Sequence, residues 1–128
     1  MAGEAKKVTG IGGVFLKVRD GKAMNEWYAK HLGIPISEWG AKFEWREKEN
    51  PDREGMTIWS LFPEKSDYFG AGDARVMINY RVQNLDALLQ ALQAAGVRID
   101  PKRQDESYGR FAWIYDPEGN KIELWEPK

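Results

Sequence analysis

The sequence contains no cysteine and only one histidine, His31. The absence of cysteine excludes disulfide bonds, thiolate metal sites and a cysteine nucleophile. A single histidine likewise excludes any site within one chain that needs two or more imidazole ligands. His31 falls in a predicted helix, so we interpret it as a packed or surface residue of that helix.

The chain also lacks long apolar runs and an excess of charge of either sign. No segment approaches the roughly 18 consecutive apolar residues of a membrane-spanning helix. Residues 1–7 have no apolar run after their lysines, so they do not read as a secretory signal. With 19 basic and 20 acidic residues, the formal net charge is -1, which gives no basic surface for nucleic acid. We therefore expect a cytoplasmic protein that binds neither nucleic acid nor membrane.

The chain is rich in aromatic residues for its length of 128 residues, with six tryptophans, five tyrosines and five phenylalanines. This length is typical of one domain with a real hydrophobic core. Packing in that core is the simpler explanation for any one ring. Rings exposed on a concave sheet would instead form a pocket for a flat or apolar ligand.

A weak internal repeat indicates the fold. Residues 14–18 form an apolar strand pattern followed by a helical stretch that ends at Gly33. A similar strand pattern occurs 64 residues later, at residues 78–82, followed by a helical stretch that ends at Gly96. A repeat of half the chain length implies duplication of a strand–helix–strands unit, and hence an α+β fold.

Both helical stretches have apolar residues at helical spacing and a capping residue in front. Asn84 precedes the second stretch and Asp20 precedes the first. The stripes consist of Met24, Trp27, Tyr28 and His31 in the first half and of Leu85, Leu88, Leu89 and Leu92 in the second.

The expected strands alternate between an apolar face, which the helices would cover, and a mixed face. The mixed face is polar, charged and aromatic, a pattern typical of a cavity wall and also of a sheet that faces solvent. Strands are expected within residues 14–18, 42–46, 56–62, 76–82, 110–115 and 121–125, with a loop at 47–55, a linker at 63–73 and a β-turn at 116–119. The mixed face carries Gly13, Phe15, Lys17, Met77, Asn79, Arg81, Lys121, Glu123 and Trp125.

Three segments carry a resemblance to a known family. Residues 115–124, Tyr-Asp-Pro-Glu-Gly-Asn-Lys-Ile-Glu-Leu, resemble the ending of vicinal oxygen chelate proteins, the glyoxalase/bleomycin-resistance superfamily. Residues 14–33, with Trp27-Tyr28 and His31-Leu32-Gly33, are similar to its opening strand and helix. Residues 82–87 resemble the start of its second module. The resemblance covers about residues 10–126 and implies two tandem βαβββ modules that form a cupped, incomplete barrel, often completed in a homodimer.

On this basis residues 1–9 are expected to be a flexible tail and residues 10–128 a single domain. Its modules would span about 10–70 and about 74–127.

The resemblance also implies where a metal ion would bind in catalytic relatives. The corresponding positions here are Gly13, Ser60, Met77 and Glu123, of which only Glu123 is a competent ligand. A catalytic divalent ion needs at least three nitrogen or oxygen ligands and an open position. We therefore predict that this protein uses no metal cofactor.

Without a metal ion, Glu123 is a carboxyl group on an aromatic concave face. Burial would raise its pKa and suit it to accept a proton. Arg110 or Arg81 would then stabilise developing negative charge. An ion pair of Glu123 with Lys17, Arg81 or Lys121 is the structural alternative. The residues predicted to contact a small-molecule ligand, an aromatic one included, are Phe15, Lys17, Met77, Asn79, Arg81, Tyr108, Trp113 and Trp125.

Three functions fit these observations. The first is a metal-free small-molecule-binding protein, as in the bleomycin-resistance branch of the family. The second is a metal-independent enzyme of the lyase or isomerase type with Glu123 as general base. The third is a degenerate member kept for dimerisation or partner binding. A metal-dependent lyase or dioxygenase remains the alternative if the aligned ligand positions are wrong.

Overall fold

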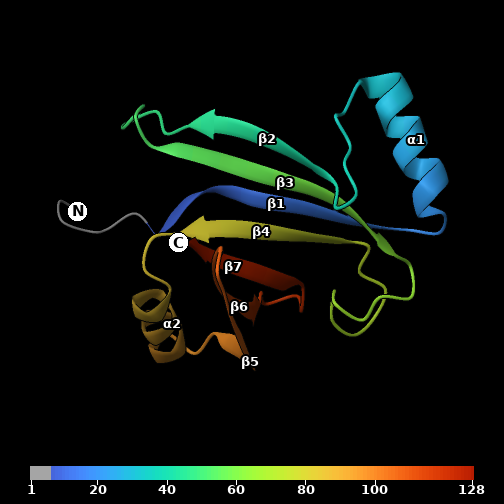
Figure 1. Cartoon of the computed structure of the whole chain (residues 1–128). Helices are drawn as coiled ribbons and strands as arrows, with labels where there is room; N and C mark the ends of the chain where they lie inside the picture. The colour runs from blue at the N-terminus through green and yellow to red at the C-terminus, as the bar shows by residue number, and fades with distance from the viewer. Residues whose placement is uncertain (1–6) are drawn as a thin grey trace. The chain divides into compact units, whose positions relative to one another are not determined.

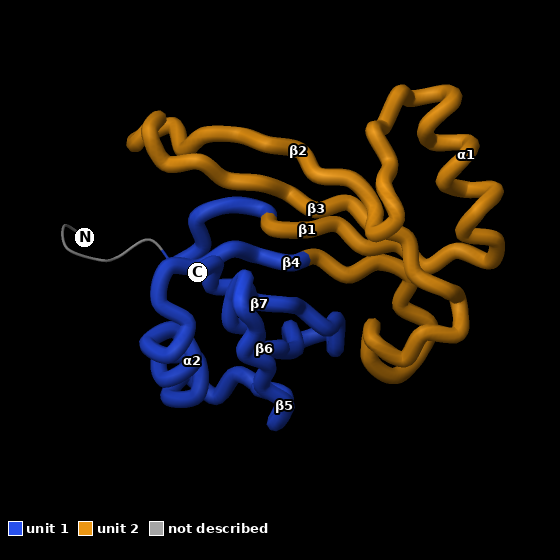
Figure 2. Tube along the Cα trace, in the orientation of Figure 1, with its two compact units in different colours: residues 1–11, 79–128 blue, residues 12–78 orange. Residues whose placement is uncertain are grey.

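The computed structural model describes residues 7–128, and over these residues it contains two helices and seven strands (Figure 1). The chain divides into two compact units (Figure 2). Residues 12–78 form what we call the N-terminal unit. Residues 79–128, together with residues 7–11, form the C-terminal unit. Within residues 7–128 no helix is long and apolar enough to cross a membrane.

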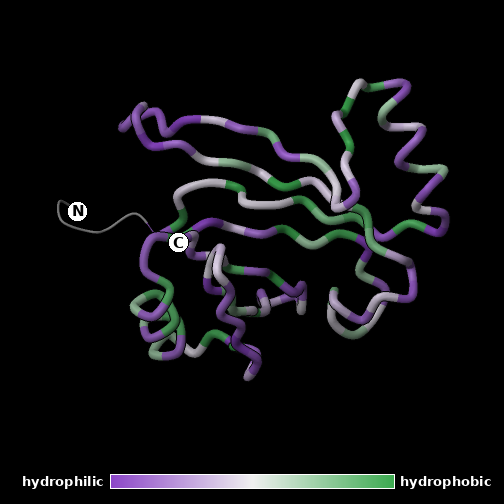
Figure 3. The backbone as a smooth tube through the Cα atoms, viewed as in Figure 1, coloured by the Kyte–Doolittle hydropathy of each residue, from purple (hydrophilic) through white to green (hydrophobic). Residues whose placement is uncertain are grey.

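The N-terminal unit is a small sheet with one helix. Its elements are β1 (Val8–Val18, of which the first four residues belong to the C-terminal unit), α1 (Gly21–Leu32), β2 (Ala41–Arg46) and β3 (Glu54–Pro63). The strands lie in the order β2–β3–β1. β2 pairs with β3 in antiparallel fashion, and β1 pairs with β3 in parallel. The loop between β2 and β3 is hydrophilic along most of its length (Figure 3).

Helix α1 begins and ends where the sequence predicts. The Asp20 carboxylate accepts a hydrogen bond from the backbone N–H of Ala23 at 3.0 Å, which satisfies a free donor of the first turn. Gly33 ends the helix with a left-handed φ of 67°, a conformation that glycine adopts without steric cost. The predicted apolar stripe is not buried, because no residue of α1 is buried and the Trp27 side chain is 50% exposed.

Residues 63–73, predicted to be a linker, hold part of an aromatic cluster. The ring centroid of Phe62 lies 5.4 Å from that of Phe15, 5.6 Å from that of Tyr68 and 5.3 Å from that of Phe69. Phe69 is only 1% exposed. This segment is therefore packed into the N-terminal unit.

The C-terminal unit has a longer sheet and the better-packed helix. Its elements are β4 (Val76–Val82, of which the first three residues belong to the N-terminal unit), α2 (Leu85–Ala94), β5 (Arg98–Glu106), β6 (Gly109–Tyr115) and β7 (Lys121–Pro127). The strands lie in the order β4–β7–β6–β5. β4 and β7 are parallel, and the other neighbours are antiparallel.

The core of the C-terminal unit lies between α2 and one face of this sheet. Asn84 caps the helix by accepting a hydrogen bond from the N–H of Ala87 at 3.1 Å, as predicted. Gly96, the predicted stop, follows the last turn with a φ of 81°. The buried core residues are Val82, Leu85, Leu88, Leu89, Ala112 and Leu124, with Tyr80, Leu92, Ile99, Ile114 and Ile122 packed against them.

The Asp-Pro-Glu-Gly motif forms the turn of the β6–β7 hairpin. The N–H of Gly119 donates to the carbonyl of Asp116 at 2.9 Å, which closes the predicted β-turn. The Asp116 carboxylate also accepts hydrogen bonds from the N–H groups of Glu118 and Asn120, each at 2.9 Å. This part of residues 115–124, the segment that resembles the family's C-terminal motif, therefore holds β6 and β7 in register.

The predicted α+β fold class is confirmed, with two differences in detail. The second half is βαβββ, whereas the first half has two strands after its helix and only an isolated bridge between Ser37 and Gly40. Strand β5 was not predicted, because Pro101 and its many charged residues hide the strand pattern at a sheet edge.

The N-terminal boundary also differs from the prediction. β1 starts at Val8, inside the segment 1–9 that was predicted to be a flexible tail. The rest of that prediction, residues 1–6, lies outside the described residues.

Candidate functional site

The face of the C-terminal sheet opposite α2 carries polar and aromatic side chains in register. Asn79 of β4 pairs with Glu123 of β7, which pairs with Trp113 of β6. One step further along the strands, Arg81 pairs with Trp125, which pairs with Phe111. We call this the polar–aromatic face; its residues are Asn79, Arg81, Phe111, Trp113, Lys121, Glu123 and Trp125.

Glu123 lies at the centre of this face and is buried, with 3% of its surface exposed. One carboxylate oxygen, Oε1, accepts a hydrogen bond from the side-chain amide of Asn79 at 2.6 Å. The other, Oε2, accepts from the indole N–H of Trp113 at 2.9 Å. Strand pairing thus brings two N–H donors to one carboxyl group from both neighbouring strands.

Burial raises the pKa of Glu123 to about 8, because the charged form loses its hydration. The N–H donors of Asn79 and Trp113 act in the opposite direction, since they stabilise the carboxylate. With a pKa near 8 the group is mostly protonated at neutral pH, and only about a tenth of it is ionised at pH 7. It can therefore donate a hydrogen bond to a ligand or take up a proton from one.

Asn79 contributes a second feature of interest. Its side chain is 2% exposed, and its amide nitrogen is bound to Glu123. Its carbonyl oxygen, Oδ1, is buried and has no hydrogen-bond partner among residues 7–128. A buried acceptor without a partner is costly, so Oδ1 is a site where a ligand that carries an N–H or O–H group would bind favourably.

An aromatic row lies beside this polar pair. The guanidinium carbon of Arg81 is 5.4 Å from the ring centroid of Trp125, and the Trp125 ring is stacked on Phe111 at 6.0 Å and 3°. Tyr108, which is 58% exposed, meets the Phe111 ring edge-on at 5.7 Å. The backbone carbonyl of Tyr108 accepts a hydrogen bond from the Trp125 indole at 3.3 Å. Trp125 is 8% exposed between Arg81 and Phe111, whereas Phe111 is half-buried and Tyr108 is exposed. A flat ligand could therefore stack at the outer end of the row, on Phe111 and Tyr108.

Arg110, predicted to stabilise negative charge beside Glu123, lies elsewhere. It pairs in the sheet with Glu126, and its guanidinium binds both carboxylate oxygens of Asp86 on α2, at 3.0 and 2.9 Å. These hydrogen bonds hold the pKa of Asp86 below its ordinary value. By strand alternation Arg110 points to the α2 side of the sheet. The structure therefore does not bring Arg110 to the face that carries Glu123, and its catalytic role stays an untested prediction.

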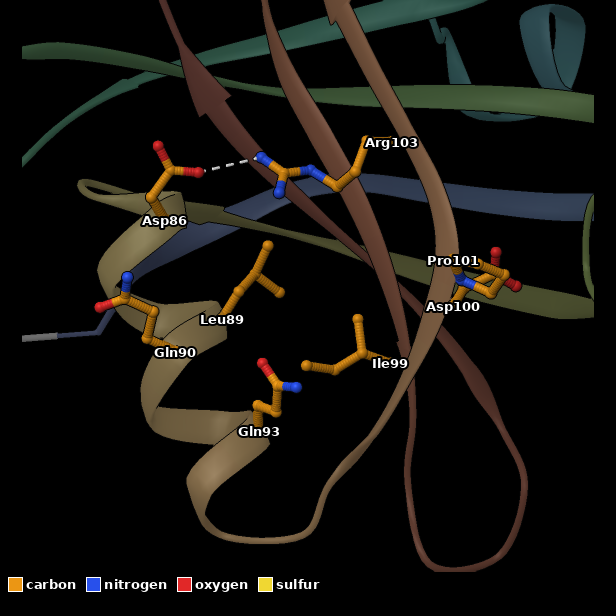
Figure 4. Close-up of a pocket in the computed structure, with 8 residues that line it drawn as sticks. All are labelled: Asp86, Leu89, Gln90, Gln93, Ile99, Asp100, Pro101 and Arg103. Carbon is orange, nitrogen blue, oxygen red and sulfur yellow. Dashed lines mark hydrogen bonds and ion pairs between the residues drawn. The ribbon is translucent and has the colours of Figure 1, made fainter.

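An open groove of about 470 Å³ lies on the α2 side, between α2 and β5 (Figure 4). Leu89 and Ile99 form its apolar floor, and Arg103 closes one end by a 3.1 Å ion pair with Asp86. Its other polar side chains are the exposed Gln90 and Gln93 and the half-buried Asp100. The groove lies on the other side of the sheet from Glu123 and contains none of the predicted site residues.

The remaining predicted ligand contacts belong to the N-terminal unit. Phe15 packs against Phe62, and the Lys17 ammonium lies 5.1 Å from the centroid of Phe69. Met77 is buried, with 1% of its surface exposed. The C-terminal unit by itself brings together Asn79, Arg81, Trp113, Glu123 and Trp125, with Tyr108 at the exposed end of the aromatic row.

Sequence reasoning missed Phe111. Phe111 shares its face with Trp113, but that face could not be assigned until the hairpin register was known. The β-turn at Asp116 was the usable signal, because it fixes which residues of β6 and β7 lie opposite each other.

The residues at the family's metal-ligand positions do not fit a divalent cation. Gly13 has no side chain, and the Ser60 hydroxyl donates to the carbonyl of Trp39 at 3.1 Å. Met77 offers a thioether, which is a poor ligand for a hard ion. Glu123 receives N–H donors on both oxygens. Across residues 7–128, no three Asp, Glu, His or Cys residues come together in a group that could hold a metal ion.

Known proteins resemble this chain in sequence and fold. A profile of the Glyoxalase/Bleomycin resistance protein/Dioxygenase superfamily matches residues 10–124. The uncharacterized protein YraH of Bacillus subtilis is 28% identical over 120 residues, 87% of this chain and 93% of YraH.

Two solved structures share the fold. Methylmalonyl-CoA epimerase from Mycobacterium tuberculosis has a TM-score of 0.64 at 22% identity, covering 98% of this chain and 92% of that protein. A variant of the Streptomyces coelicolor methylmalonyl-CoA epimerase, in complex with 2-nitronate-propionyl-CoA, has a TM-score of 0.68 at 18% identity, covering 94% and 98%. At these identities the likeness concerns the fold alone.

Proposed function

The chain belongs to the Glyoxalase/Bleomycin resistance protein/Dioxygenase superfamily, and from this premise we propose that it binds a small molecule, without a metal ion, on the polar–aromatic face. The observation that carries the proposal is the buried pair of Glu123 and Asn79. It offers a titratable carboxyl group and an unpartnered carbonyl oxygen beside stacked rings.

The cost of this arrangement supports a functional interpretation. A buried carboxyl group and a buried acceptor without a partner both destabilise a fold relative to apolar side chains of similar size. Perturbed ionisable groups and unsatisfied polar atoms concentrate at functional sites for this reason. The opposite side of the same sheet is packed with aliphatic residues, so the fold does not need polar residues here to be stable.

The expected ligand is a small molecule with a flat or apolar body and a hydrogen-bond donor. The Phe111 and Tyr108 rings at the outer end of the aromatic row suit the body, and Oδ1 of Asn79 suits the donor. The solved epimerase in complex with 2-nitronate-propionyl-CoA is consistent with small-molecule binding by this fold. A homodimer, as the family resemblance implies, and a cytoplasmic location, as the sequence leads us to expect, are part of the proposal.

Phenylnaphthylamine, a neutral aromatic fluorophore with one N–H group, tests the proposal. We expect its emission to rise on binding, with one site per chain and no change on adding a chelator. Asn79→Leu removes the acceptor and is expected to weaken binding roughly fivefold, the usual worth of one hydrogen bond. Asn50→Leu, on the exposed β2–β3 loop, is the matched control and should bind like the wild type.

Two results would contradict this proposal. One is an absence of saturable binding, and the other is equal affinity of the Asn79→Leu and Asn50→Leu variants. Tight binding of a stoichiometric metal ion, measured by elemental analysis of protein purified without chelators, would overturn the metal-free part.

A second candidate function is proton transfer by Glu123, as in a metal-independent isomerase. The buried carboxyl with a pKa of about 8 favours it, because a base that titrates near neutral pH can both take and return a proton. The probe is methylmalonyl-CoA in deuterated water, followed by deuterium uptake at the carbon next to the thioester carbonyl. If the protein is active, the Glu123→Gln substitution should lower the exchange rate about a hundredfold or more. The Glu44→Gln substitution, at an exposed residue of β2, should leave the exchange rate unchanged. Exchange no faster than in buffer would rule out this reaction for this substrate.

A further inference from the structure

The aromatic row continues onto β5, the last strand of the sheet, as a pair of polar side chains. Phe111 of β6 pairs with Gln104 of β5, and Gly109 pairs with Glu106. Residues that lie directly opposite each other in an antiparallel pair of strands point to the same side of the sheet, so Gln104 lies next to the Phe111 ring. Because side chains alternate along a strand, Glu106 shares this side. Gln104 and Glu106 therefore adjoin the polar–aromatic face at the edge of the sheet.

The other residues of this part of β5 confirm which way the pair points. Arg103 forms an ion pair with Asp86 of α2 at 3.1 Å, which places it on the α2 side of the sheet. Asp105, two residues further on, shares that side by alternation. Arg103 and Asp105 are both exposed, whereas Gln104 and Glu106 are half-buried. At this edge the polar side chains are thus more sheltered on the side where the ligand is proposed to bind.

The pair offers two hydrogen-bond acceptors to a ligand. The side-chain amide of Gln104 donates to Oε1 of Glu106 at 2.8 Å, which holds the two side chains together. Within residues 7–128, no group donates a hydrogen bond to the other carboxylate oxygen of Glu106 or to the carbonyl oxygen of Gln104. These two oxygens, which come from adjacent side chains, are therefore available to the N–H groups of a ligand.

The carboxylate of Glu106 forms no ion pair within residues 7–128. Three basic residues near this corner of the sheet bind carboxylates on the α2 side instead: Arg103 and Arg110 bind Asp86, and Lys128 binds Asp105. A ligand that brings a positive charge to Glu106 would therefore meet a carboxylate that has no cationic partner in this part of the chain.

The rings beside this pair also suit a cation. Tyr108, in the turn between β5 and β6, is 58% exposed, and its ring meets the half-buried Phe111 ring at 5.7 Å. Aromatic faces attract cations, and a planar cation can stack on a ring while it donates N–H groups in its own plane to a carboxylate. Rings next to a carboxylate therefore favour a planar nitrogen cation over an anion. The same row already holds one, because the Arg81 guanidinium lies 5.4 Å from the Trp125 ring centroid.

We propose that Gln104 and Glu106 bind a planar nitrogen cation, an amidinium or guanidinium group, at one end of the ligand whose flat body stacks on the exposed rings of the aromatic row. This inference rests on the proposed function and narrows its substrate class to flat cationic molecules. Glu106 supplies the negative charge and one acceptor. Gln104 supplies the second acceptor and, through its own N–H, fixes the position of the Glu106 carboxylate.

The test compares two fluorescent probes with the same flat body. The compound 6-amidino-2-phenylindole differs from 2-phenylindole by one amidinium group, and both carry the N–H donor that the proposed function requires. At low ionic strength we expect the amidine to bind roughly tenfold more tightly, and added salt to reduce the difference. Glu106→Gln should weaken binding of the amidine roughly fivefold and Gln104→Leu roughly threefold. Both substitutions should have a much smaller effect on the affinity for 2-phenylindole.

Glu118→Gln is the matched control, because it removes the same charge from an exposed residue in the turn at the other end of the β6–β7 hairpin. It should leave both affinities unchanged. If 2-phenylindole binds but the amidine binds no more tightly, or if Glu106→Gln behaves like Glu118→Gln, the cation subsite is wrong while the proposed function stands. If neither probe binds, the proposed function fails and the subsite with it.

Discussion

Replacing Glu123 by glutamine is expected to make the protein more stable than the wild type at alkaline pH and to flatten its dependence on pH. Burial raises the pKa of this group from 4.5 to about 8 in the folded chain. The folded state therefore holds the proton more tightly than the unfolded state. The stabilisation from protonated Glu123 is fully present below about pH 4.5 and is lost as the pH rises through about 8.

The size of this effect follows from the shift. At 1.36 kcal/mol per pK unit, the wild type should lose about 3 kcal/mol of its free energy of unfolding between about pH 6 and about pH 9. Glutamine cannot ionise, so the variant should lose little over that range. Its amide can also be accommodated, because rotation of the Asn79 amide by half a turn offers the unpartnered Oδ1 as an acceptor.

Urea unfolding of both proteins at the two pH values measures this prediction. Glu44→Gln, an exposed residue of β2, is the control and should retain the dependence of the wild type. The pKa values of Asp86, Asp100 and Asp116 are lowered from the ordinary value of 3.8. These three carboxylates therefore stay ionised at both pH values and do not contribute to the difference. If the free energy of unfolding changes equally between the two pH values for the wild type and for Glu123→Gln, then Glu123 is ionised in the folded protein at neutral pH.

Gly109→Ala is expected to destabilise the protein by about 2–3 kcal/mol, a typical cost of overpacking, and to impair phenylnaphthylamine binding. A Cβ atom at this position would overlap the indole of Trp125 and lie 3.0 Å from the carbonyl oxygen of Glu126. Trp125 cannot easily move away, because Phe111 is stacked on it and it is only 8% exposed. The substitution should therefore push the ring out of the aromatic row.

Thermal unfolding, together with the probe titration, checks this expectation. Gly21→Ala is the matched control, since no heavy atom lies within 4 Å of its added Cβ and the residue begins α1. That change should be neutral or stabilising by up to about 1 kcal/mol. A Gly109→Ala protein with wild-type stability and probe affinity would mean that Trp125 is free to move, and that the aromatic row is not a preformed surface.

The helices and the α2-side core could be predicted because they depend on residues close together in the chain. The leucine spacing from Leu85 to Leu92 places one apolar stripe on one side of a helix. Asn84 and Asp20 satisfy donors only three residues away. The strand alternation of β4 and β7 likewise assigned Asn79, Arg81, Glu123 and Trp125 to one face.

The arrangement of the site depended on pairings between distant segments. Asn79 meets Glu123 across 44 residues of sequence through the parallel pairing of β4 and β7. Trp113 meets Glu123 through the register set by the β6–β7 hairpin. No local sequence pattern predicts either register, because the pairing of strands that are far apart in the chain is set by the packing of the whole sheet.

The sequence by itself determined the fold class, the helix boundaries and a single buried carboxyl candidate, Glu123, because periodicity and capping act over a few residues. The tertiary structure alone decided which groups surround that carboxyl. It turned Arg110 away to Asp86 and brought in Trp113 and, beside it, Phe111. Each of these depends on strand register, and a shift of one residue would move every such side chain to the other face of the sheet.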